Sequence, residues 1–311
     1  MTRIDDAFKS QGLSGLPSHT YLMPMIEAFV ASGAADTNYL DELNGDAGQF
    51  WSRIWEAMLH ARFTDQGWTV SGAGAGPDFC VEAANGPVLV EATVPAPEGL
   101  PASQLVFTPG VHDGAHKEIL LRWTAKLADK RAMHEEHISK KLADPALPFV
   151  IAINSCRLGW APEENGISQW PYAVEATFPI GPLAVPIDPE THEMGEAFQS
   201  LRFSIPKKPG VDIPTGNFLD PAYAAVSALI GCARCYADDA TAEKFVGQPP
   251  YVLVHNPLAT NPLPRGWLPG AIEYAAEQTD EETFVLSRLT PRDEQTEAQE
   301  PGQGEGNPIS S

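Results

Sequence analysis

Basic side chains are scarce in this sequence. Lys and Arg together number 20 against 41 Asp and Glu, which gives a formal net charge of −21 over 311 residues. The last stretch, from Pro291, holds five acids and one Arg and so accounts for only four of these charges. An acidic surface argues against broad, unspecific binding to nucleic acid, because that binding depends on Lys and Arg displacing counterions. Chemistry on phosphate would therefore need a local basic stripe or a bound cation.

Cysteine is also scarce, and long apolar runs are missing. Cys80, Cys156, Cys232 and Cys235 are too few for a disulfide scaffold and suit a reducing cytosol. No run of 18 apolar residues occurs, so the sequence predicts no membrane span. The first residues, MTRIDDAFKSQGL, lack the basic stretch and apolar core of a secretory signal. We therefore expect a cytoplasmic protein without membrane contact.

The apolar content of 43% is ordinary for a globular chain long enough to bury one large core or two modest ones. Changes in composition along the chain divide it into four segments. These are an N-terminal helical segment (1–45), an α/β core (46–160), an extension rich in Pro and Gly and packed on the core (161–290), and an acidic tail expected to be disordered (291–311).

Apolar periodicity predicts the elements of the core segment. Phe50, Ile54 and Met58 recur at helical spacing in the stretch GQFWSRIWEAMLHARFTDQGW. After a hairpin, a second helix is expected over about 116–142, and the unbroken apolar run PFVIAINSC (148–156) predicts a buried strand. The order of helix, hairpin, helix and strand predicts a mixed α/β core.

The extension offers fewer signals. DPAYAAVSALIGCARCYADD predicts a helix from Asp220, and PYVLVHNPLA predicts another buried strand over 250–259. Cys232 and Cys235 fall in the expected helix, and because a structural zinc would need two further ligands, buried thiols are the better interpretation. His255, at the end of the strand, fits hydrogen-bonded scaffolding better than catalysis.

The hairpin stretch GPDFCVEAANGPVLVEATVP carries acidic residues in its body. Asn85-Gly86 is a strong signal for a two-residue turn, and alternation around it predicts one apolar face made of Phe79, Val81, Ala83, Val88, Val90 and Ala92. The other face then carries Asp78 and Glu91 as a diagonal pair with side-chain bases roughly 5–8 Å apart. A divalent cation would offset two like charges this close, and Mg²⁺ (or Mn²⁺) commonly binds through one or two carboxylates plus substrate phosphates. The alternative is a solvated outer face.

This arrangement resembles the PD-(D/E)XK, or restriction-endonuclease-like, nuclease superfamily. Pro77-Asp78 matches the first element of its motif, Glu91 matches the second, and Glu56 stands where the superfamily often places an auxiliary acid on the preceding helix. The stretches IWEAMLHARF, GPDF, VEATVP, RWTAKLADK, PFVIAINSC and HNPLA also resemble a bacterial group within this superfamily, a likeness that implies no particular substrate. The resemblance implies an α/β fold with a restriction-endonuclease-like mixed sheet flanked by helices, here with a Pro-rich β and helical extension.

The third element of the motif departs from the pattern. The superfamily places a Lys two residues after the Glu, and this chain has Thr93 there, which cannot lend positive charge to an attacking water or to phosphate. Arg122, Lys126 and Lys130, spaced by four, form one stripe on the following helix. Lys126 or Lys130 is therefore a candidate for the missing catalytic cation, and Arg122 for contact with phosphate. The alternative is a solvated face paired with nearby acids.

The resulting hypothesis is a metal-dependent endonuclease that hydrolyses phosphodiester bonds of nucleic acid, with DNA favoured over RNA. Asp78 and Glu91 would hold the metal, Glu56 would assist directly or through water, and Lys126 or Lys130 would complete the catalytic set. The alternative is a catalytically inactive protein of the same fold that acts as a binding or interaction module, which the net charge and Thr93 both favour.

Overall fold

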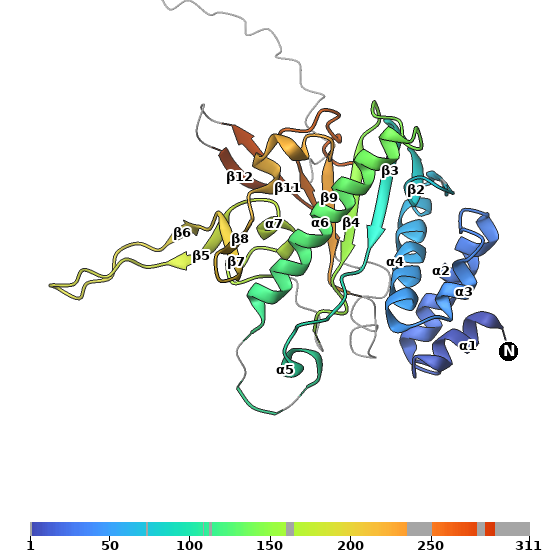
Figure 1. Cartoon of the computed structure of the whole chain (residues 1–311), viewed down its shortest axis with the longest axis horizontal. Coiled ribbons are helices and arrows are strands. Elements are labelled where there is room, and N and C mark those ends of the chain that lie inside the picture. The colour runs from blue at the N-terminus through green and yellow to red at the C-terminus, as the bar shows by residue number, and fades with distance from the viewer. Residues whose placement is uncertain are drawn as a thin grey trace, which may run out of the picture.

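The computed structural model describes residues 2–72, 74–107, 109–111, 114–159, 165–234, 251–278 and 284–289. The tail expected to be disordered from residue 291, and Cys235, lie outside these ranges. Within them, an eight-stranded mixed sheet is flanked by helices on both faces (Figure 1). The chain is therefore mixed α/β, as the order of elements predicts.

Helices occupy the N-terminal segment and then alternate with strands. They are α1 (Arg3–Ser10), α2 (Pro17–Ser32), α3 (Tyr39–Leu43), α4 (Ala47–Thr64), α5 (Ala102–Leu105), α6 (His116–Ser139) and α7 (Tyr172–Glu175), with 3₁₀ turns η1 (Asn217–Leu219) and η2 (Pro221–Tyr223). A capping box fixes the start of α4, because the Asp46 carboxylate accepts from the backbone of Gln49 while the Gln49 side chain accepts from the backbone of Asp46.

The large sheet combines parallel and antiparallel neighbours. Its strands, in spatial order, are β1 (Thr69–Ser71), β2 (Phe79–Ala83), β3 (Gly86–Thr93), β4 (Phe149–Asn154), β9 (Ala228–Cys232), β10 (Val252–His255), β11 (Ile272–Gln278) and β12 (Phe284–Leu289). β3, β4 and β9 are parallel, as are β10 and β11, and the other neighbours are antiparallel. Two separate ribbons pair β5 (Ile180–Ala184) with β6 (Phe198–Leu201), and β7 (Ser204–Lys208) with β8 (Val211–Pro214).

Two apolar cores lie on opposite faces of this sheet. α4 and the helices before it cover one face, and α6 and α7 cover the other (Figure 1). Val150 of β4 packs in the first core and Ile151 in the second, which explains why this strand is apolar without interruption. The indole N–H of Trp55 on α4 donates to the carbonyl of Ala152 at 3.1 Å and so ties the helix to the centre of the sheet.

The prediction of a helix from Asp220 is wrong. Asp220 instead caps the short turn η2, and the chain then enters β9, whose five residues are all buried between β4 and β10. The sequence ALIGC is apolar enough for either state, and the pairing with two neighbouring strands decides for the strand. Cys232 therefore lies in a strand, not in a helix, and its thiol is buried.

Gly231 of β9 allows α7 to pack closely on the sheet. A Cβ atom at this position would lie 2.7 Å from the Ala173 Cβ and 3.2 Å from the Trp123 ring. We expect Gly231→Val to lower the free energy of unfolding by about 1–3 kcal/mol, because overpacking forces the neighbours apart. Urea denaturation measures this, with Gly114→Val, at a position open to solvent, as the control. Equal stabilities of the two variants would contradict the close packing.

Candidate functional site

The acidic hairpin is formed by β2 and β3, in a register that differs from the expected one. Phe79 pairs with Val90 and Ala83 with Gly86, so Ala84 and Asn85 form the loop rather than Asn85 and Gly86. Gly86, with φ +107°, is the first residue of the returning strand and uses its conformational freedom there. The predicted register is wrong by two residues, and an even shift leaves every side chain on its predicted face.

In the observed register the two acids lie closer to one another than in the predicted one. Extending it by one residue sets Asp78 directly opposite Glu91 rather than diagonal to it. The Asp78 Oδ2 accepts a hydrogen bond from the backbone N–H of Ala92 at 2.7 Å, which holds its carboxylate against the end of β3. Phe79 and Val90 point into the core beneath α4, while Glu91 and Thr93 are buried on the side of α6. The hairpin thus presents both acids at one place.

Lys130 of α6 reaches these acids. Its Nζ lies 2.6 Å from Glu91 Oε1, and both side chains are largely buried. Lys126 is directed elsewhere, with its Nζ 3.9 Å from the carboxylate of Asp129 on the same helix and its side chain 34% exposed. Of the two candidate lysines, Lys130 is therefore the one that the fold brings to Glu91.

Arg122, the third basic residue of the predicted stripe, lies near the loop that follows β3. Its guanidinium would be 3.1 Å from a Cβ atom built on Gly99. It is on the same helix as Lys130, two turns closer to the N-terminus, and it is partly exposed.

Glu56 approaches the acids from α4, held by Arg53. The Arg53 Nη1 lies 2.7 Å from Glu56 Oε2 and 2.9 Å from Asp36 Oδ2, and the same guanidinium binds Glu42. Arg53 thereby connects the N-terminal helices to the site. The sequence analysis did not select Arg53, although its spacing of three residues from Glu56 on a helix is a signal for an ion pair.

Burial and mutual repulsion raise the pKa values of two carboxyl groups in this cluster. Burial raises the pKa of Asp78 to about 6, with a further contribution from the charge of Glu91, while Lys130 opposes the rise. Burial also raises the pKa of Glu56 to about 8, the charge of Asp78 adds to this, and Arg53 opposes it. Both carboxyl groups therefore hold their protons to higher pH than exposed ones do, chiefly because burial penalises the charged form.

The residues present fit a hard divalent cation. Glu91 Oε1 is bound by Lys130, and Glu91 Oε2 is buried without a hydrogen-bond partner, although such an atom normally has one. Among the described residues, no three or more His, Cys, Asp and Glu side chains are already arranged as metal ligands. Mg²⁺ does not need such a cage, since it commonly uses one or two carboxylates, waters and substrate phosphates. Asp78 and Glu91 are the residues that would hold it.

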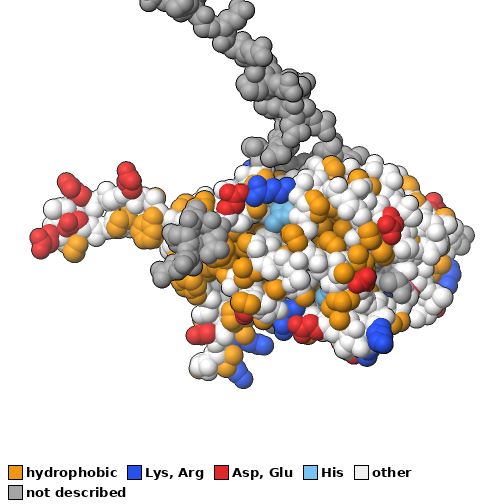
Figure 2. All heavy atoms as spheres, turned by 90° about the horizontal axis from the view of Figure 1, so that it is seen from above, with side chains coloured by type: hydrophobic (Ala, Val, Ile, Leu, Met, Phe, Trp, Pro, Cys, Tyr) orange, Lys and Arg blue, Asp and Glu red, His pale blue; other side chains and the backbone are white. Residues whose placement is uncertain are grey.

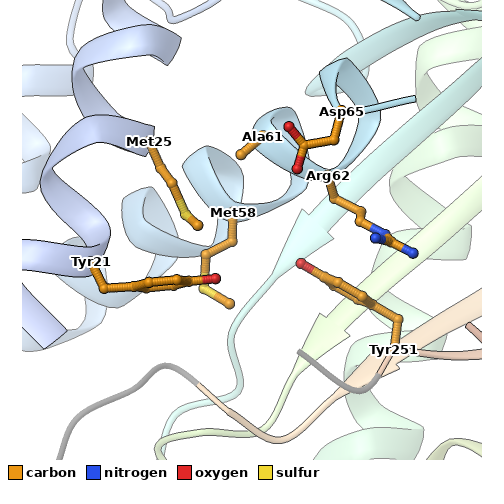
Figure 3. A pocket seen from close by; sticks show the side chains of 7 residues that line it. All are labelled: Tyr21, Met25, Met58, Ala61, Arg62, Asp65 and Tyr251. Atoms are coloured by element: carbon orange, nitrogen blue, oxygen red, sulfur yellow. The ribbon is translucent and has the colours of Figure 1, made fainter. Parts of the chain in front are cut away.

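Two small cavities of about 20 Å³ lie away from this cluster. One lies between α2, α4 and the start of β10, with Arg62 beside the ring of Tyr251 (Figure 3). The other adjoins Gly231, between β9 and the α6–α7 layer. Each has room for about one water molecule. Neither is lined by Asp78, Glu91 or Lys130.

His255 and His134 have structural surroundings. The His255 Nε2 lies 3.1 Å from Glu273 Oε2, and the same oxygen accepts from the backbone N–H of Gly266. The ring of His134 stacks on Phe149 at 3.7 Å, and burial lowers its pKa to about 4. His255 thus links β10, β11 and the loop before β11, in agreement with the scaffolding interpretation.

We expect the raised pKa of Glu56 to make stability depend on pH. Because the unfolded chain releases this proton near its ordinary pKa and the folded protein near 8, folding becomes less favourable as pH rises between these values. Glu56→Gln keeps an acceptor for Arg53 but removes the ionisation. Its stability relative to the wild type should therefore increase from pH 4.5 to pH 8, measured by urea denaturation. A difference that stays constant with pH would contradict the raised pKa.

Three comparisons with known proteins complete the description of the chain. No protein-family model matches it. No curated protein matches it, and no solved structure matches its fold. Within the part of the chain that the structure describes, no helix is both long enough and apolar enough to cross a membrane. The cluster of Asp78, Glu91, Glu56 and Lys130 is therefore interpreted from its own geometry and chemistry.

Proposed function

We propose that this protein is a metal-dependent nuclease with a restriction-endonuclease-like core, which hydrolyses phosphodiester bonds in nucleic acid. The observation that carries the proposal is the contact of 2.6 Å between Lys130 Nζ and Glu91 Oε1, beside Asp78. It supplies, from α6, the positive charge that Thr93 cannot supply from β3. The PD-(D/E)XK motif is thereby completed in space by a lysine that is remote in sequence.

The arrangement of elements supports the same assignment. α4, the β2–β3 hairpin, α6 and β4 follow one another in the order that the superfamily resemblance implies, and β3 and β4 are parallel neighbours. α4 and α6 lie on opposite faces of these strands. Glu56 of α4 approaches Asp78 from one face of the sheet, and Lys130 of α6 approaches Glu91 from the other. Side chains of both helices therefore lie at the end of the hairpin that is away from its turn.

Each residue then has a defined task. Asp78 and Glu91 would bind Mg²⁺ or Mn²⁺ through their carboxylates, with Glu56 assisting directly or through water. The bound cation would lower the pKa of a coordinated water and offset charge on the phosphate. The Lys130 ammonium stabilises the negative charge that develops on the phosphate or orients the attacking water. Arg122 contacts a neighbouring phosphate, and DNA is the favoured substrate over RNA.

Metal binding tests the proposal before any substrate is known. Calorimetric titration of the wild type with Mn²⁺ should show a site of about one ion per chain, with affinity that increases as pH rises through 6, because the ion competes with the proton on Asp78. Asp78→Asn should abolish the site. Thr93→Ala, two residues after Glu91 on β3 but without a ligand role, is the matched control and should retain it.

Cleavage is the second measurement. Wild type with Mn²⁺ should cut mixed single- and double-stranded DNA and RNA substrates, and Asp78→Asn should not. A Mn²⁺ site that is present in the wild type and lost in Asp78→Asn, together with cleavage by the wild type, supports the proposal of a nuclease. An absent site in the wild type would contradict it.

A catalytically inactive binding module is the second candidate, and one observation favours it. The Lys130–Glu91 pair is largely buried, with side-chain exposures of 15% and 5%, and an ion pair can serve fold specificity alone. This candidate requires no Mn²⁺ site that depends on Asp78. The calorimetric titration therefore separates the two functions.

A further inference from the structure

A buried carboxylate joins four segments of the chain at the base of the β5–β6 ribbon. Glu175 of α7 has no exposed surface. Its Oε1 accepts from the backbone N–H and the hydroxyl of Ser168, while its Oε2 lies 3.0 Å from Arg202 Nη2 and 3.1 Å from His116 Nε2. These partners come from a turn formed by residues 166–170, from the end of the ribbon and from the start of α6. The Glu175 carboxylate is therefore the point where these segments meet.

The ribbon depends on the contacts at its base. Figure 1 and Figure 2 show that it extends away from the body of the protein. Its side of the contact includes Arg202, which binds Glu175, and Gln199, whose Oε1 accepts from the indole N–H of Trp170 at 3.3 Å. Because a two-stranded ribbon is only marginally stable by itself in water, these contacts decide how firmly it is held.

The 166–170 turn is held in a strained conformation. Gln169 has φ +67°, in the left-handed region that an L side chain rarely adopts. Gly166 packs so closely on the carboxylate that a Cβ atom there would lie 2.3 Å from Glu175 Oε1. Such a conformation persists when surrounding contacts enforce it, and the hydrogen bonds of the turn to Glu175 and His116 are contacts of this kind.

The hydrogen bonds of His116 assign a neutral ring to it. The backbone N–H of Ile167 donates to Nδ1 at 3.1 Å, so Nδ1 carries no proton. Burial raises the pKa of the Glu175 carboxyl, but hydrogen bonds from His116 and Ser168 outweigh burial and hold that pKa below its ordinary value. Glu175 is therefore ionised and accepts from the Nε2–H group. The imidazole ring, which stacks on Tyr172 at 5.3 Å, thus has one donor and one acceptor, each with a partner.

We propose that protonation of His116 opens the 166–170 turn and thereby loosens the base of the β5–β6 ribbon, as a pH-dependent switch. An imidazolium carries N–H groups on both ring nitrogens, so Nδ1 then points a donor at the N–H of Ile167 instead of accepting from it. A ring flip gives no relief, because it brings another donor to the same place. The turn has to move away, and Trp170 leaves Gln199 with it.

The charged groups around His116 favour the closed turn while the ring is neutral. Glu175 from α7 and Arg202 from the ribbon neutralise one another, and on α6 itself Lys117 lies 3.8 Å from Glu118. A proton on the ring would add a net positive charge to a side chain that is only 15% exposed. The closed turn therefore binds this proton less tightly than the open turn does, so acid favours the open turn. Histidine ordinarily changes its charge between about pH 5 and 8, which gives the range of the switch.

Tryptophan fluorescence of the full-length chain tests the proposal, because the Trp170 indole donates to Gln199 and lies 5.4 Å from the ring of Tyr274. Between pH 8 and pH 5 the wild type should show a shift of emission to longer wavelength that is absent from Trp170→Phe. His116→Gln stays neutral and keeps a donor and an acceptor, so it should lose the transition. His116→Lys has donors only and should show the shifted emission already at pH 8. His137→Gln, the same substitution near the other end of α6, is the matched control and should keep the transition.

The outcomes of this experiment separate opening of the turn from unfolding. A transition that is lost in Trp170→Phe and His116→Gln and kept in His137→Gln, with unchanged far-UV circular dichroism, supports the proposal. A wild type without a transition, or a transition that persists in His116→Gln, would overturn it. Emission of His116→Lys at pH 8 that equals that of the wild type would overturn it as well, as would a transition accompanied by loss of secondary structure.

Discussion

Lys130→Met should reduce Mn²⁺-dependent cleavage by about 100-fold or more, the usual effect of removing one group that stabilises charge developing in the transition state. Lys126→Met should leave the rate within about twofold. Both lysines lie on α6 four residues apart, and the first contacts Glu91 while the second lies beside Asp129. The pair is thus a matched test of which position supplies the catalytic cation.

Metal binding distinguishes loss of chemistry from loss of folding in this experiment. Lys130→Met keeps both proposed metal ligands, Asp78 and Glu91, and removes the ammonium group that competes with Mn²⁺ for Glu91. The variant should therefore bind Mn²⁺ at least as tightly as the wild type. Loss of cleavage together with retained metal binding assigns Lys130 to the reaction. Equal activities of the two lysine variants would contradict that role, even if the metal site itself is confirmed.

Arg53→Met should lower the free energy of unfolding by about 3 kcal/mol at pH 8.5, because it leaves the largely buried Glu56 without its partner. Asp36 and Glu42 lose the same guanidinium, so the N-terminal helices should loosen from α4 as well. Urea denaturation measures the effect. Arg62→Met, on the same helix, is the control: it loses the ring of Tyr251 and the carbonyl of Pro269 but leaves no buried acid without a partner, so it should cost less than Arg53→Met.

A double-mutant cycle identifies the part of this effect that belongs to Glu56. In the Glu56→Gln background no buried carboxylate is left to neutralise, so Arg53→Met should cost about 1 kcal/mol less than it does in the wild type. The cost should also be smaller at pH 5, where Glu56 is protonated. Costs that are the same in both backgrounds would show that Arg53 acts through Asp36 and Glu42 alone.

The sequence by itself determined the elements whose signals are local. The helical spacing of Phe50, Ile54 and Met58 predicts α4, and the strict alternation in the hairpin predicts its apolar face with no knowledge of its neighbours. Because strand side chains alternate with a period of two, the prediction that Asp78 and Glu91 share a face did not depend on the register, which was wrong by two residues.

The tertiary structure decided what depends on neighbours distant in sequence. The apolar run of β9 fits a helix or a strand equally well, and its position between β4 and β10 makes it a strand. Lys126 and Lys130 belong to one stripe, and the way α6 crosses β3 places Lys130 on Glu91. The contacts of Arg53 with three acids likewise join α4 to the N-terminal helices. Periodicity fixes which face of an element a side chain occupies, whereas the packing of whole elements fixes which side chains from different elements meet.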